Sequence, residues 1–110
     1  MKLPNADRAV VEIDKLTQYC LNPAHPRGRH KARVFESVLG LTAADGDPLR
    51  EALLDAALRE DAMPGEGDEH GQRYVIEFAI TGPVGSATVR SAWIVRADEV
   101  FPRFVSCYVL

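Results

Sequence analysis

The run Tyr74-Val75-Ile76-Glu77-Phe78-Ala79-Ile80 places its larger apolar side chains at every second position. A period of two predicts a β-strand with one buried face. The next residues, Thr81-Gly82-Pro83-Val84-Gly85, are typical of a turn. Ala87–Val95 then predicts the second strand of a hairpin, and Phe104–Val109 predicts a third strand.

The residues before this region follow a helical period instead. Asp14 is the expected N-cap of a first helix, which the prolines within 22–26 end. A second helix is expected over Arg29–Leu39, ended by Gly40. A third should begin at Asp47-Pro48 and close at 63–65, before a loop over 64–71. The short apolar run 9–11 fits either a strand or the lead-in to the first helix.

Helices followed by a strand meander predict an α+β fold. We expect about three N-terminal helices packed on one face of an antiparallel sheet of three to four strands. With 110 residues, the chain is expected to form a single domain over 1–110. The residues expected to be buried together are Phe35, Leu39, Leu53, Tyr74, Ile76, Phe78, Val89 and Val95, and Trp93 is also expected in the core.

Several classes of protein are disfavoured by composition and motifs. No apolar run reaches the roughly 18 residues of a membrane span, and no secretory signal is apparent. We therefore expect a cytoplasmic protein whose Cys20 and Cys107 are buried and reduced. The three histidines and two cysteines lack the spacing of a metal site, and no nucleotide-binding loop is present. Neither a metal nor a cofactor is predicted.

Charge is distributed unevenly along the chain. Residues 1–40 contain seven Lys/Arg and four Asp/Glu, whereas residues 41–70 contain two and nine. The most basic stretch is Arg27-Gly28-Arg29-His30-Lys31-Ala32-Arg33. Because nucleic-acid binding depends on local basic patches, the net charge of -3 does not exclude it. A solvated helix start explains the same residues and is the more common origin of such a charge run.

Two places therefore carry groups suited to a phosphodiester. The start of the second helix combines free backbone N–H groups with Arg29, His30 and Lys31. In the sheet, Arg90 lies in mid-strand, so it should occupy an open face or pair with Glu77. Arg90, Ser106 and Tyr108 on one open face are compatible with phosphodiester binding or with an ordinary solvated surface.

Two longer segments resemble a known family. They are Lys15–Gly40, which contains Asn22-Pro23-Ala24-His25-Pro26-Arg27-Gly28, and the ending Ser91-Ala92-Trp93-Ile94-Val95 with Phe101–Tyr108. The chain resembles small bacterial domains of unknown function that occur as free proteins and as C-terminal tips of polymorphic toxins. Many of the free forms are encoded beside another small protein, which implies a small antitoxin-like protein partner.

A more distant similarity is to the barnase/EndoU/colicin/RelE-like ribonuclease toxins. It rests on Gly-x-x-Lys-Ala-x-x-Phe at 28–35 and on Pro-Arg-Phe-x-Ser at 102–106. This resemblance implies metal-independent cleavage of RNA. It points to Lys31, Arg103, Ser106 and Tyr108, with Ser91 beside them. The chain departs from the pattern because its sheet region has no histidine, which leaves His30 as the imidazole near the motif.

Two functions follow as hypotheses. In the first, the chain is a ribonuclease-like toxin domain with His30 or Tyr108 as acid or base. Lys31, Arg90 and Arg103 would stabilise charge, Ser106 would donate a hydrogen bond, and Arg29 and Ser91 would contact the substrate. In the second, it is a non-catalytic module that binds a small partner protein, with the acidic middle segment meeting a basic partner.

Overall fold

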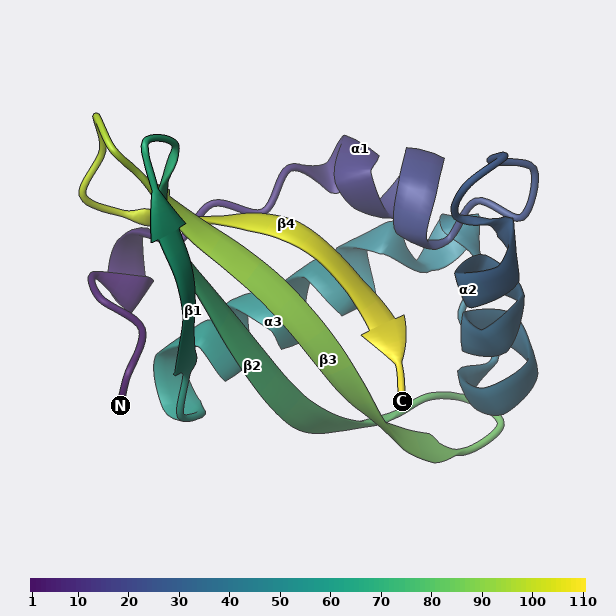
Figure 1. Ribbon diagram of the computed structural model, residues 1–110. Coiled ribbons are helices and arrows are strands. Elements are labelled where there is room, and N and C mark those ends of the chain that lie inside the picture. Colours follow the sequence, from purple (N-terminus) through teal and green to yellow (C-terminus); the bar gives the residue numbers. More distant parts are fainter.

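The computed structural model describes residues 1–110, with helices before residue 60 and strands after it (Figure 1). The helical segments are η1 (Ala6–Arg8), α1 (Ile13–Lys15), η2 (Leu16–Cys20), α2 (Arg29–Val34), η3 (Phe35–Leu39), η4 (Ala43–Asp45) and α3 (Gly46–Arg59). The strands are β1 (Met63–Asp68), β2 (Gly71–Thr81), β3 (Ser86–Arg96) and β4 (Pro102–Val109). This order confirms the predicted α+β fold.

The four strands form one antiparallel sheet in the order β1-β2-β3-β4. In Figure 1, α3 crosses behind the sheet, while α2 stands at the end of the sheet where the chain terminates. The helices pack on one face, so the other face of β2, β3 and β4 is left without a covering element. Val10 forms a parallel bridge with Arg103, which extends the outer edge of β4 by one residue.

The prediction of a loop over 64–71 was wrong, because most of these residues belong to strand β1. All six residues of β1 are exposed, so they need not alternate between apolar and polar. Pro64, Gly65 and Gly67 interrupt the pattern further, and the pairing with β2 shifts register between Pro64 and Gly67. An exposed edge strand of this kind carries no hydrophobic signal in its sequence.

Helix ends differ from the predictions by a few residues. The first helix starts after Glu12, and it continues as a π-helix over η2. The third starts at Gly46 and ends at Arg59. It stops early because the following residues extend to meet the N-terminus, where Ala62 N–H donates to the Met1 carbonyl. The second helix spans α2 and η3 as predicted, and Gly40 ends it with φ at 73°.

Side chains from the helices and from the covered face of the sheet form one hydrophobic cluster. Seven of the eight residues expected in the core belong to it, and Val95 is only partly buried against it. Trp93 is fully buried, as expected, and its ring meets that of Phe104 edge to face at 5.6 Å. Phe35 is likewise fully buried, at the junction of α2 and η3.

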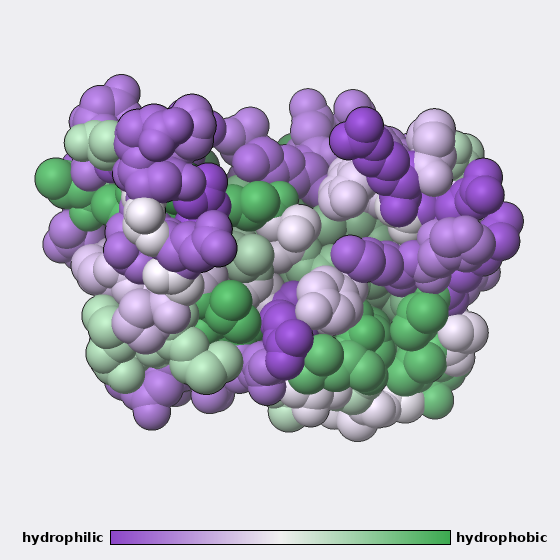
Figure 2. All heavy atoms as spheres, in the orientation of Figure 1, coloured by the Kyte–Doolittle hydropathy of each residue, from purple (hydrophilic) through white to green (hydrophobic).

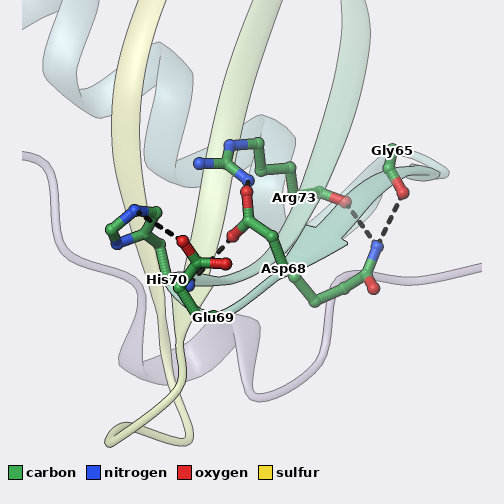
Figure 3. Close-up of polar contacts among 6 residues, drawn as sticks. Gly65, Asp68, Glu69, His70 and Arg73 are labelled. Carbon is green, nitrogen blue, oxygen red and sulfur yellow. Dashed lines mark hydrogen bonds and ion pairs between the residues drawn. The ribbon is translucent and has the colours of Figure 1, made fainter.

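The tip of the β1–β2 hairpin is held by polar contacts (Figure 3). Asp68 accepts from the His70 backbone N–H at 2.9 Å and from Arg73 Nη1 at 2.8 Å. The side-chain amide of Gln72 donates to the carbonyls of Gly65 and Arg73. The His70 backbone N–H first, and then Arg73, lower the pKa of Asp68 below its ordinary value of 3.8.

Replacing Phe35 should test the core directly. We expect Phe35→Ala to lower the free energy of unfolding by about 3–5 kcal/mol, because apolar burial is lost and a cavity remains. Urea denaturation measures this change. Val38→Ala, at a half-exposed position in η3, is the matched control and should cost less than about 1 kcal/mol. A loss below about 1 kcal/mol for Phe35→Ala would contradict the core assignment.

The hairpin tip should respond to acid. A carboxyl whose pKa is lowered by folding adds stability above its unfolded pKa and loses it as pH falls through the folded pKa. Wild type should therefore be more stable than Asp68→Asn near neutral pH, and the difference should vanish as the pH falls through the lowered pKa of Asp68. Urea denaturation over a pH series measures it. Glu66→Gln, on the same strand and outside any ion pair, should show no such pH-dependent difference.

Candidate functional site

A short ordered loop directs the start of helix α2. His25 packs edge to face on Tyr19, with ring centroids 4.7 Å apart. Its Nδ1 accepts the backbone N–H groups of Arg27 and Gly28, each at 3.1 Å. Gly28 is buried so tightly that a Cβ atom there would lie 2.8 Å from the Tyr19 carbonyl oxygen. The loop therefore fixes where α2 begins and which of its faces meets the core.

This placement brings Lys31 over strand β4. Ala32 and Phe35, three residues apart, point into the core. Lys31 lies on the flank of the helix and is exposed. Its Nζ stands 4.6 Å from the centroid of the Tyr108 ring, in the geometry of a cation–π contact. Two residues 77 positions apart in the chain, both predicted from sequence, thus meet at the end of β4.

Tyr108 is one member of a row of polar side chains that crosses the sheet from β2 to β4. Glu77, Arg90 and Tyr108 are register partners on β2, β3 and β4. Arg90 binds Glu77 Oε2 through Nη2 at 2.6 Å and Nε at 2.9 Å, and its Nη1 donates to Tyr108 Oη at 3.2 Å. We call Glu77, Arg90, Tyr108 and Lys31 the cross-sheet row. The hydrogen bonds to Glu77 first, and then to Tyr108, raise the pKa of Arg90, which keeps it charged.

The cross-sheet row lies on the face that the helices leave uncovered. Val89 and Ser91, the chain neighbours of Arg90, are buried toward the helices, so Arg90 points the other way. The side chains of Arg90 and Glu77 are 41% and 34% exposed. No enclosed pocket is present anywhere in the structure. The row therefore lies on an open, partly exposed surface of the sheet.

Three other predicted residues lie near the row without joining it. Ser106 pairs with Ala92 across the sheet and precedes Tyr108 by two positions, so both point to the open face. Its hydroxyl makes no hydrogen bond, so it is free to donate one. His30 and Arg29 are exposed in the first turn of α2 and make no ion pair.

Arg103 lies in a different place. It pairs with Ile94, four residues along β3 from Arg90, which corresponds to about 13 Å. Its guanidinium binds both carboxylate oxygens of Glu99 at 2.8 Å, and Glu12 lies 3.6 Å away. These partners keep the pKa of Arg103 raised and that of Glu99 lowered. The charge of Arg103 is thus compensated locally, away from the cross-sheet row.

Ser91 is completely buried on the covered face. Its hydroxyl donates to the Ile76 carbonyl at 2.8 Å and accepts from Trp93 Nε1 at 2.9 Å. Its donor and acceptor roles are therefore both used inside the protein. The position of Ser91 gives it a structural task.

The two cysteines meet in the core, which their separation in sequence does not suggest. Both are buried and free, as predicted. The neighbouring Cys107 thiol lowers the pKa of Cys20 against the opposing effect of burial, and the Cys107 backbone and the Lys31 charge lower it further. Cys20 and burial raise the pKa of Cys107. The alternation along β4, which turns Cys107 inward, was the one available signal.

Two further features concern metal binding and membrane crossing. No three His, Cys, Asp or Glu side chains lie close enough together to hold a metal ion. None of the helices combines the length and the apolar character needed to cross a membrane.

The role of Ser91 can be measured through stability. Ser91→Ala leaves the Trp93 N–H and the Ile76 carbonyl without this partner, so we expect a loss of about 1–3 kcal/mol in the free energy of unfolding. Ser106→Ala is the matched control, because that hydroxyl has no partner, and should change stability by less than about 0.5 kcal/mol. Equal effects of the two substitutions in urea denaturation would refute a structural role for Ser91.

Comparison with known proteins places this geometry in context. A chain of the contact-dependent growth inhibition toxin - immunity protein complex from Klebsiella pneumoniae 342 has a similar fold, with a TM-score of 0.65 at 16% identity. The match covers 94% of this chain and 95% of that one. No curated protein matches the sequence. The family model described as "Domain of unknown function (DUF6883)" matches residues 2–110, so the chain belongs to the DUF6883 family.

Proposed function

We propose that the chain is a ribonuclease-like toxin domain that cleaves RNA without a metal ion, and that the cross-sheet row is its phosphodiester site. The observation that carries this proposal is the meeting of Lys31, Arg90 and Tyr108 on one open face. The three residues come from α2, β3 and β4. The similarity in fold to a chain of a toxin–immunity complex supports a role within a toxin–immunity system.

The chemistry would follow from charge and hydrogen bonding. In metal-free RNA cleavage a base takes the proton of the 2′-hydroxyl, which attacks the adjacent phosphorus. Negative charge grows on the phosphorane oxygens, and the bond from phosphorus to the 5′-oxygen breaks as an acid protonates that leaving oxygen. Lys31 is a free cation at the row, and Arg90 is held rigidly by Glu77. Donors fixed in this way stabilise such charge without reorganising. Tyr108 or His30 would transfer protons, and Ser106 would donate a hydrogen bond from the same face.

Two of the predicted residues are left out of this site. Arg103 is paired with a carboxylate as Arg90 is, but it lies about 13 Å along the sheet from Arg90 and so outside the row. Ser91 is buried and fully hydrogen-bonded. Arg29 stays in the proposal as a contact for neighbouring phosphates, because it is exposed in α2 and has no acidic partner.

A non-catalytic module that binds a small partner protein is the second candidate. The observation in its favour is the group of exposed aliphatic side chains beside the row, which includes Val34, Val38 and Val84. RNA cleavage does not need such residues, whereas protein interfaces use them. A small antitoxin-like partner is also compatible with the first candidate, since one surface can hold a substrate or its inhibitor.

Substitution of Lys31 separates the two candidates. If the row cleaves RNA, Lys31→Ala should reduce the rate by about 10²–10³-fold, measured on purified protein with total RNA at low salt. Arg33→Ala removes an equal charge two positions along α2, roughly 200° around the helix axis, and is the matched control. It should retain most of the activity. Urea denaturation should show little change for either variant, since both side chains are exposed.

The wild-type protein provides the decisive negative result. A ribonuclease should harm cells on induction, and its binding to RNA should weaken as salt rises. Purified protein that neither binds nor cleaves RNA at low salt, and that is harmless when expressed, would exclude the first candidate and leave the binding module.

A further inference from the structure

An apolar stripe runs along α2 and η3 beside the cross-sheet row. Lys31, Val34 and Val38 follow one another at spacings of three and four, so they share one side of the helix. Val34 and Val38 are 39% and 38% exposed. Neither residue belongs to the hydrophobic core cluster. Their exposure at adjacent positions marks a surface that another molecule can cover.

Two further aliphatic side chains extend this surface at the same end of the sheet. Val84, in the β2–β3 turn, is 65% exposed, and its backbone N–H donates to the Leu39 carbonyl. Leu110 is 56% exposed and follows β4, with its N–H bonded to the Thr88 carbonyl. Figure 2 shows hydrophobic atoms gathered where α2, the β2–β3 turn and the C-terminus converge in Figure 1. We call Val34, Val38, Val84 and Leu110 the aliphatic patch.

Unpaired positive charge borders the patch. Lys31, on the same side of the helix as Val34 and Val38, is exposed and takes part in no ion pair. Arg27, Arg29 and Arg33 are also exposed and outside any ion pair, but Arg29 and Arg33 lie roughly 200° around the helix axis from Lys31. The acidic tip of the β1–β2 hairpin lies at the opposite end of the sheet from α2 (Figure 1). The cations are therefore not neutralised within the molecule, and the rim of the patch favours a negatively charged partner.

The combination of patch and rim selects the kind of partner. A protein interface consists of an apolar centre and a polar rim, which this surface provides. RNA would be attracted by the cations, but it gains little from valine and leucine, because bases stack on aromatic side chains. A second copy docked symmetrically would place the basic rim against itself, which is unfavourable.

We propose that this surface docks a partner protein whose apolar contact is ringed by carboxylates. Lys31 belongs both to the stripe and to the cross-sheet row, so the bound partner covers the row. On the proposed function, a partner that covers the row inhibits RNA cleavage. Occupation of the surface is a separate matter from cleavage, and the two are measured by different experiments.

Titration of the 110-residue protein followed by amide NMR tests the docking surface. The probe is a synthetic amphipathic helical peptide with a leucine face flanked by glutamates, and its counterpart carries lysines instead. The glutamate peptide should shift the amide resonances of residues 31–40, 84–86 and 110, and added salt should weaken its binding. The lysine peptide should bind at least ten-fold more weakly. Absence of binding by the glutamate peptide, or equal binding by both, would overturn the proposal.

Two charge-introducing variants locate the contact. Val38→Asp should weaken the glutamate peptide at least ten-fold, because a carboxylate enters the patch. Val100→Asp is the matched control: Val100 is 58% exposed in the loop between β3 and β4, away from α2, and should bind like wild type. The amide spectrum of each variant reports whether the fold is kept. Equal losses in both variants would contradict a contact at the patch.

The other occupants have their own signatures. Binding of a single-stranded RNA oligonucleotide is measured with the same variant. If Val38→Asp weakens RNA binding as much as it weakens peptide binding, the patch is reassigned to nucleic acid. A wild-type dimer in sedimentation that Val38→Asp dissociates would reassign it to a second copy. If the peptide binds at the patch while the RNA assay of wild type is negative, the docking surface stands and the proposed cleavage fails.

Discussion

The indole N–H of Trp93 has to find an acceptor in a fully apolar interior, and the arrangement of the sheet follows from that requirement. Ser91, two residues earlier on the same face of β3, supplies the accepting oxygen, and its own O–H donates a hydrogen bond to the Ile76 carbonyl on β2. A slip of one residue would turn Trp93 to solvent and leave buried polar groups unpaired. The pair therefore fixes the register of β2 and β3.

The same register builds the open face. If Ser91 points inward opposite Ile76, then Arg90 must point outward opposite Glu77. On the other side of β3, strand β4 places Tyr108 opposite Arg90. Val105 is an extra residue in β4, and the bulge that it forms opposite Ala92 and Trp93 keeps Phe104 in the core. The polar row on one face and the aromatic core on the other are thus two results of one pairing.

Sequence patterns predicted the parts of this structure that depend on burial. Alternation of the kind seen around Ile76 was sufficient to predict strands β2, β3 and β4. The glycine at position 40 was sufficient to predict the end of the second helix. Edge strand β1 was missed because it buries nothing and so leaves no period to detect. Among the candidate site residues, Lys31, Arg90 and Tyr108 come together, whereas Arg103 does not. The turn that carries Glu99 back to Arg103 decides that outcome, and no pattern in the chain revealed it.

The start of α2 is where local preference and global fold disagree. Arg29, His30 and Lys31 occupy the first turn, where the helix dipole disfavours cations, and neither an acidic residue nor a side-chain cap compensates them. Burial of Ala32 and Phe35 has to stabilise the helix instead. A sequence selected for stability alone would place carboxylates here. Departures of this kind are expected where a surface is kept for binding or chemistry, and this one coincides with the junction of the cross-sheet row and the aliphatic patch.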